Sequence, residues 1–252
     1  MKKIIFLFFL LPAFASQAQE IPLGFRGGIS IPNLSSSGSS QNPLNTGYSS
    51  RLGPEFGLFT EFKISKLFSI ETMVEYSSQG GKKDGLQAFP TPPELAPEFA
   101  PNPAPTYLYA NFNSDAKINY LMIPILAKFG HHFKNSPWKI YIDAGPFVGF
   151  LLSAKQVTTG SSQIYLDPAG QEPLPGGAQS FDNTQDFKNQ LHNANFGVEG
   201  NLGVNYRFGA NNIFFEVGGN YGFLNIQKGT ANGQNNTGAA TVVLGYSFWL
   251  NK

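Results

Sequence analysis

The most constraining feature of this chain is a two-residue alternation between apolar and polar side chains. From 55 to 64 the even positions are almost all apolar, whereas Glu61 and Lys63 stand on odd positions. From 68 to 77 the alternation recurs, with Glu75 on the odd face. Successive side chains of a β-strand point to opposite faces of its sheet. The pattern therefore predicts strands with one apolar face and one face that carries the charges.

Stretches of this kind recur about eight times. They cover 21–32, 52–65, 67–80, 115–129, 138–153, 194–208, 212–227 and 238–250. The connections near 65–67, 130–137 and 208–212 are short, and those near 33–51, 81–114, 154–193 and 228–237 are longer. Short turns at one end and long loops at the other are typical of outer-membrane barrels. The sequence predicts an all-β fold, an eight-stranded antiparallel up-and-down transmembrane β-barrel with short periplasmic turns and long extracellular loops.

The first residues have the three regions of a secretory signal peptide. Two lysines precede an apolar run over 4–11, and small residues lead to Ala18. This run is too short to span a bilayer as an uncleaved helix. We therefore expect cleavage after Ala18, with 1–18 as the signal peptide and 19–252 as the barrel domain.

Composition removes several other classes of protein. No later segment holds about 18 uninterrupted apolar residues, which excludes a helical membrane protein. The chain has no Cys, which excludes a disulfide scaffold and a thiolate metal site. Its formal net charge of +1 provides no electrostatic footprint for nucleic acid. A secreted soluble β-protein and an outer-membrane barrel remain, and the segregation of the loops favours the barrel.

The polar faces of the predicted strands carry ten charged residues, although only 13% of the chain is charged. These residues are Arg26, Glu61, Lys63, Glu71, Glu75, Lys128, Asp143, Glu199, Arg207 and Glu216. In a soluble sandwich they would face water. Side chains fill the interior of an eight-stranded barrel, so there they would form a lumenal charge network. Eight of them fall in the periplasmic half as four acids and four bases, and we expect near balance because unpaired buried charges are costly.

Glycines and one proline within the predicted strands add detail to this fold. The glycines fit the tight curvature of a small barrel. Pro124 cannot donate a hydrogen bond to a strand ladder, which predicts a β-bulge at this residue. An edge strand of an open sheet would also tolerate it.

Four segments together resemble the PorT-like outer-membrane β-barrel family of Bacteroidetes. They are YLMIPILAK at 120–128, YIDAGPFVGF at 141–150, NFGVEGNLGVNY at 195–206 and GYSF at 245–248. The resemblance covers nearly all of the mature chain. It implies an eight-stranded barrel inserted by the barrel-assembly machinery, which recognises a final strand ending in an aromatic residue such as Phe248. One member type of the family is linked to protein secretion across the outer membrane.

Motifs for catalysis or cofactor binding are absent from the sequence. It contains no phosphate-binding loop, dinucleotide fingerprint or zinc-protease motif. His192 could form a hydrolytic site at the barrel rim with Asp182 or Asp186 and with Ser180 or Ser153. The same loop reads better as a short helix capped by Asp182. We expect no enzymatic activity, no catalytic residue, no metal and no cofactor.

The loop over 86–107 is unusual because it contains seven prolines. Such a segment favours an extended polyproline conformation, and it would project from the cell surface as a semi-rigid arm. Phe89, Pro92, Pro93 and Phe99 are the candidate residues for docking a partner. The alternative is a protease-resistant spacer.

These observations predict an integral outer-membrane protein with a plugged polar lumen. We expect a structural or interaction role through the surface loops, with a secretion-accessory role implied by the family resemblance. The expected partners are outer-membrane lipid, the barrel-assembly machinery during insertion and a protein at the extracellular loops, with no nucleic acid. The alternative function is a small pore or transporter for apolar solutes.

Overall fold

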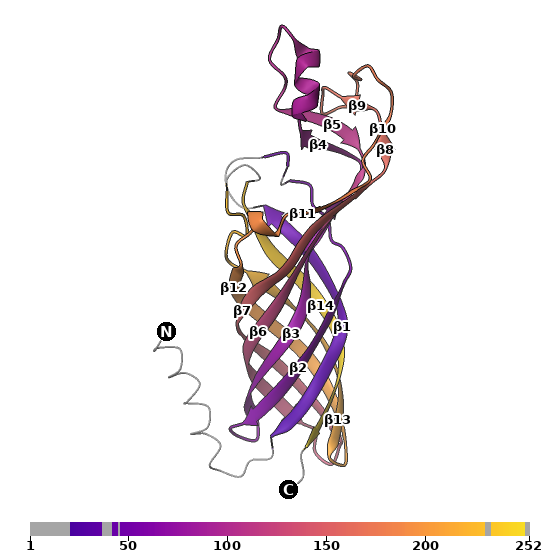
Figure 1. Ribbon diagram of the computed structural model, residues 1–252. Coiled ribbons are helices and arrows are strands. Elements are labelled where there is room, and N and C mark those ends of the chain that lie inside the picture. Colours follow the sequence, from indigo (N-terminus) through magenta and orange to yellow (C-terminus); the bar gives the residue numbers. More distant parts are fainter. Residues whose placement is uncertain (1–20, 37–41, 45, 230–232, 250–252) are drawn as a thin grey trace, which may run out of the picture.

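Eight long strands close into a ring in the computed structural model, which describes residues 21–36, 42–44, 46–229 and 233–249. The ring strands are β1 (Pro22–Ser36), β2 (Gly53–Lys63), β3 (Phe68–Lys83), β6 (Asn113–His132), β7 (Trp138–Thr159), β12 (Ala194–Phe208), β13 (Asn211–Gly222) and β14 (Asn235–Trp249). Each pairs antiparallel with its neighbours along the chain, and β1 pairs with β14 to close the ring (Figure 1). The predicted up-and-down barrel is confirmed. The predicted signal peptide lies outside the described residues.

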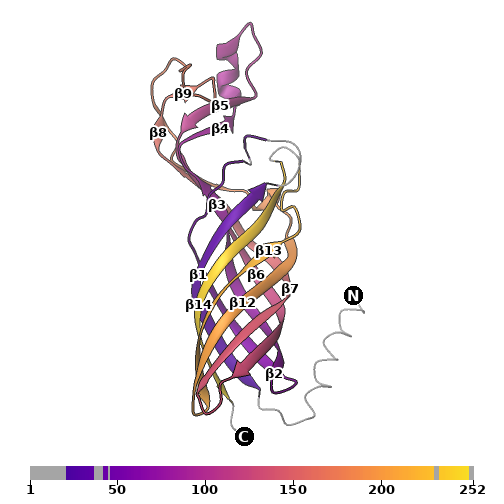
Figure 2. The same ribbon diagram turned by 180° about the vertical axis from the view of Figure 1, so that it is seen from behind.

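The connections separate by length as predicted. The turns over 64–67, 133–137 and 209–210 lie at one end of the barrel, and the longer connections lie at the other (Figures 1 and 2). Barrels of this kind place their short turns in the periplasm. Within the described part of the chain, no helix has the length and apolar character needed to cross a membrane.

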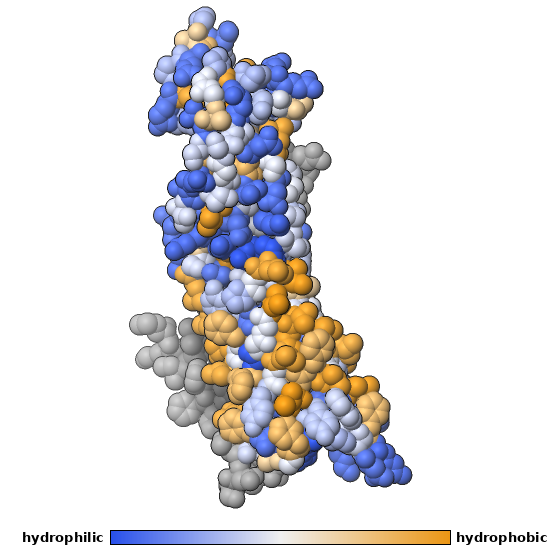
Figure 3. Space-filling model, turned by 90° about the vertical axis from the view of Figure 1, so that its right-hand side faces the viewer, coloured by the Kyte–Doolittle hydropathy of each residue, from blue (hydrophilic) through white to orange (hydrophobic). Residues whose placement is uncertain are grey.

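Apolar side chains form a belt over the lower half of the barrel on the face shown in Figure 3. Large side chains point outward there and remain exposed, including Leu58 at 69%, Leu202 at 59% and Leu244 at 63%. Such exposure in water would be an aggregation hazard, whereas hydrocarbon accommodates these side chains. The belt therefore marks the membrane-spanning part of the barrel, and the upper part of the molecule is mainly polar in the same view.

The predicted bulge at Pro124 is wrong. Pro124 pairs with Phe147 in continuous register, and the register shift between β6 and β7 falls between Asn119 and Tyr120. On the other side of β6, the pairing with β3 also continues past the proline without a shift. Met122 lies opposite Glu75 and Ile125 lies opposite Thr72, in the same register. Pro124 is thus accommodated by a local gap in the ladder without an extra residue.

The long loops fold together above the barrel into a structure that we call the extracellular module. It contains β4 (Leu86–Pro90), the 3-10 helix η2 (Pro93–Phe99), β5 (Tyr107–Asn111), β8 (Ser161–Ser162), β9 (Ile164–Tyr165) and β10 (Gln179–Ser180). Strands β4, β5 and β9 form one small sheet, and β8 pairs with β10. The module stands clear of the barrel at the loop end (Figures 1 and 2).

The predicted extended polyproline arm is wrong, because the proline-rich segment folds back on itself. Phe89 pairs with Leu108 across the β4–β5 ladder. The Phe112 and Phe181 rings stack with centroids 4.7 Å apart, and Phe89 packs edge-on against Phe181 at 5.4 Å. Ladder hydrogen bonds and ring burial thus favour a hairpin over the extended conformation.

The predicted helix over 182–191 is also largely wrong. Strand β11 (Asn183–Asp186) pairs antiparallel with the last part of β7. In this segment only the short 3-10 helix η3 (Lys188–Gln190) is helical. Asp182 does not cap a helix, since its carboxylate accepts a hydrogen bond from the Gly160 backbone N–H at 2.9 Å.

Candidate functional site

A single arginine organises the middle of the barrel interior. The Arg26 guanidinium donates to Glu75 at 2.7 Å, to Glu199 and Glu216 at 3.1 Å and to Glu55 at 3.2 Å. These carboxylates come from β2, β3, β12 and β13, and all five residues are buried. The arginine network therefore crosses the lumen from wall to wall.

A second network lies nearer the periplasmic end. The Lys128 ammonium is 2.6 Å from Glu71, 3.8 Å from Asp143 and 3.9 Å from Glu216. Glu216 also accepts a hydrogen bond from the Tyr141 hydroxyl at 2.8 Å, so this residue links the two networks. Glu71, Asp143 and Glu216 are close enough to share a metal ion, but Lys128 already provides the cation among them.

The structure brings together seven of the ten predicted lumenal charges in these two networks. They are Arg26, Glu71, Glu75, Lys128, Asp143, Glu199 and Glu216. Glu61 is only partly buried at the periplasmic mouth, and Lys63 and Arg207 are exposed at strand ends. The strand alternation fixes the face of a residue but not its depth along the barrel, which is why these three were misplaced.

Glu55 is not among the ten predicted lumenal charges, although it lies on the same strand face as Gly57 and Phe59. With it, the two networks hold six carboxyl groups and only two cations. The near balance expected for the eight charges of the periplasmic half does not hold in these two networks. Glu55, Glu75 and Glu199 join them, while the bases Lys63 and Arg207 are exposed at strand ends.

An apolar plug closes the lumen between the arginine network and the extracellular end. Ile118, Tyr120 and Met122 of β6 pack there with Phe147 and Leu151 of β7. The long loops complete it with two further buried side chains, Leu191 and Ile226. Together, the plug and the charge networks place buried side chains along the barrel interior.

The candidate rim triad is not assembled. His192 is exposed, and its backbone N–H donates to Ile226. The Asp186 carboxylate accepts from the Lys188 backbone N–H at 2.9 Å, and the Ser153 hydroxyl accepts from Asn119 at 3.0 Å. These groups are engaged locally and not with an imidazole.

A cavity of about 600 Å³ lies above the plug, between the barrel mouth and the extracellular module. We call it the vestibule. Its lining combines aromatic rings with side-chain amides. The aromatic residues are Tyr48, Phe89, Phe112, Phe181 and Phe187, and the amides are Gln87, Gln156, Asn183, Gln185, Gln190, Gln227 and Asn235.

Lys83 is the only charged residue in the vestibule lining. Its ammonium donates to the Leu44 carbonyl at 2.7 Å and lies 4.5 Å from the Tyr48 ring centroid. Burial lowers the pKa of Lys83 to about 8. Asn235 is buried, and its side-chain NH₂ has no hydrogen-bond partner among the described residues. The vestibule therefore offers apolar faces and amide groups to an occupant, and little net charge.

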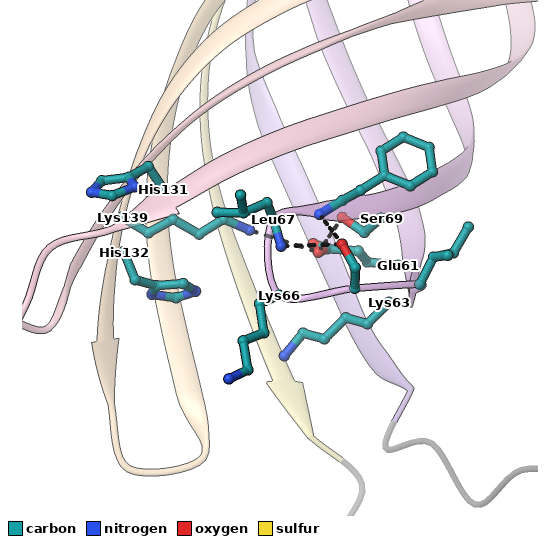
Figure 4. A pocket seen from close by; sticks show the side chains of 11 residues that line it. Glu61, Lys63, Lys66, Leu67, Ser69, His131, His132 and Lys139 are labelled. Atoms are coloured by element: carbon teal, nitrogen blue, oxygen red, sulfur yellow. Dashed lines mark hydrogen bonds and ion pairs between the residues drawn. The ribbon is translucent and has the colours of Figure 1, made fainter.

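A second cavity, of about 580 Å³, opens at the periplasmic mouth (Figure 4). Lys63, Lys66 and Lys139 line it together with His131 and His132. Among the lining residues, Glu61 is the only acid. The two ends of the barrel thus differ in chemistry, one rich in amides and aromatic rings and the other basic.

Comparison with solved structures finds outer-membrane barrels of low sequence identity. Ail, the attachment invasion locus protein of Yersinia pestis, is 10% identical with a TM-score of 0.35, over 91% of this chain and 100% of Ail. OprG of Pseudomonas aeruginosa is 14% identical with a TM-score of 0.38, over 93% of this chain and 98% of OprG. No curated protein matches the sequence. Similarity at this level says nothing about function.

The family match is more direct. The model of the outer membrane protein beta-barrel domain matches residues 16–228, which is most of the chain. The closed ring of strands and the apolar belt agree with that match. The chain belongs to the outer membrane protein beta-barrel domain family and is an integral β-barrel protein of the outer membrane.

Proposed function

We propose that this protein is a surface recognition protein, in which a closed barrel anchors an extracellular module that binds a partner. The observation that carries the proposal is the folded module itself. Its strands pair with one another, and Leu108 and Ala110 are fully buried within it. Loops that served only as spacers would not need a core of their own.

The partner surface that we propose includes the vestibule and the exposed part of η2. Of the four docking residues predicted from sequence, Phe89, Pro92 and Phe99 are half-buried and Pro93 is exposed; Phe89 and Pro92 line the vestibule. The vestibule lining favours an uncharged partner, because amides donate and accept hydrogen bonds and aromatic rings provide apolar contact. The PorT-like relationship and the secretion-accessory role remain predictions, and an unaltered secreted proteome after gene deletion would contradict the latter.

The alternative, a pore for apolar solutes, is less well supported. Such a pore needs a continuous path through the lumen. The apolar plug and the Arg26 network occupy that path with buried side chains.

Site-specific photo-cross-linking on intact cells tests the proposal. A photoreactive residue at Pro93, which is exposed on the module, is compared with one at Asn135, in a periplasmic turn. We expect an adduct of defined mass at Pro93, which added purified protein in nanodiscs suppresses by competition. The absence of any adduct at Pro93, or an adduct that the competitor leaves unchanged, would contradict a specific surface partner.

A further inference from the structure

The periplasmic cavity gathers positive charge from three separate parts of the barrel. Lys63 ends β2, Lys66 lies in the β2–β3 turn, and Lys139 lies near the start of β7. Figure 4 shows Lys139 reaching toward Glu61 while Lys63 and Lys66 extend below the turn. With the histidines neutral, three lysines and one glutamate give these lining residues a net charge of +2.

The single carboxylate in the cavity is already engaged. Glu61 accepts a hydrogen bond from the Ser69 hydroxyl at 2.7 Å, and the Lys139 ammonium lies 3.8 Å away. Arg207 adds a further cation at this mouth, with its guanidinium 5.7 Å from the Trp249 ring centroid, and Lys63 lies 3.7 Å from the same centroid. Among the described residues at this mouth, basic side chains therefore outnumber acidic ones.

The pKa of His132 responds to the same positive charges. His132 is the last residue of β6, at the periplasmic end of the barrel. Desolvation lowers its pKa, and the positive charges of Lys139, Lys63 and Arg207 lower it further, against the opposing effect of Glu61. A bound anion would relieve this repulsion.

The cavity also lies where a membrane surface would be. Ile64 and Leu67 line it and are each 58% exposed, on either side of Lys66 in the turn. Apolar side chains next to lysines are suited to the interface between hydrocarbon and headgroups, where the lysine can reach the phosphates.

We propose that the periplasmic cavity is a binding site for a phosphate group. A phosphate monoester carries about −1.5 to −2 charges near neutral pH, and a lipid phosphodiester carries about −1. Both suit a site whose described lining residues include three lysines, on more than one side, and one carboxylate. The source is either the headgroup of an anionic phospholipid in the inner leaflet or free phosphate in the periplasm. This site is independent of the proposed surface function.

Native mass spectrometry of the purified full-length barrel with phosphatidylglycerol tests the proposal. The test variant combines Lys63→Gln with Lys66→Gln, and the control is Lys134→Gln, which changes a periplasmic lysine outside the cavity lining. A lysine near an anionic membrane surface contributes about 1 kcal/mol, or about fivefold, to membrane binding, and we take this as the scale for the lipid headgroup. We expect the double variant to lose on the order of tenfold or more of the lipid adduct and the control to keep it. Heat-modifiable gel migration verifies that every variant is folded.

Inorganic phosphate distinguishes the two sources. If it raises the His132 pKa measured by NMR and displaces the lipid, the site accepts free phosphate; if the lipid alone binds, the headgroup is the source. Either result supports the site, provided that the double variant loses it. Equal lipid binding and an equal response to phosphate in the wild type and the double variant would overturn the proposal. An equal loss in the Lys134→Gln control would also overturn it.

Discussion

Replacing Arg26 by methionine tests the arginine network directly. The substitution keeps much of the side-chain volume but removes the only guanidinium within 2.7 to 3.2 Å of Glu55, Glu75, Glu199 and Glu216. Removing one partner of a buried ion pair typically costs about 3–5 kcal/mol, because the remaining charge is left uncompensated. Here four carboxyl groups share the lost partner, so we expect Arg26→Met to lower the free energy of unfolding by at least this amount.

Urea titration of the barrel in lipid vesicles measures this loss. Arg207→Met is the matched control, since Arg207 is exposed at a strand end and a surface change of this kind usually alters stability by about 0.5 kcal/mol or less. Adding Glu75→Gln to Arg26→Met should recover part of the loss, because it removes one uncompensated carboxylate. A loss below about 1 kcal/mol for Arg26→Met, or equal losses for the two arginine variants, would contradict a stabilising role for the arginine network.

Three further predictions concern packing and pH. A Cβ at Gly203 would lie 2.2 Å from the Tyr141 ring, whereas one at Gly200 meets only ordinary contacts from 3.5 Å. Gly203→Ala should therefore lower the free energy of unfolding, measured by urea titration, by about 1–3 kcal/mol. An equal effect of Gly200→Ala would contradict this. Phe112→Ala should make the extracellular module sensitive to protease on intact cells while the barrel stays folded by gel migration, and unchanged protease resistance would count against an aromatic core. Burial lowers the pKa of Lys83 to about 8 from 10.5. Between pH 8 and 10.5 the unfolded chain therefore binds more protons than the folded chain, and the free energy of unfolding should rise with pH. Lys83→Met should abolish this rise, and a rise that persists in the variant would show that it has another origin.

Much of the barrel could be predicted because two-residue alternation acts locally. It placed Arg26 and Glu75 on the inner face and Leu58 on the outer face, where the structure has them. Position along the barrel axis depends on strand stagger, which the pattern does not encode. Arg207 and Lys63 therefore have the predicted face but not the predicted burial.

The loops could not be predicted in the same way, since their structure depends on contacts between distant segments. The prolines favoured an extended arm, but pairing of β4 with β5 and packing of Phe89 on Phe181 outweighed that local preference. The apolar plug likewise takes Leu191 and Ile226 from two different loops. No local pattern in the sequence marks these residues as neighbours.

We propose that the barrel is closed and acts through its surface. Conductance of the purified full-length protein in a planar lipid bilayer tests whether the lumen is closed. We expect no stable unitary conductance, because the apolar plug and the Arg26 network place buried side chains across the lumen. Reproducible unitary conductance steps from the wild-type protein would contradict it.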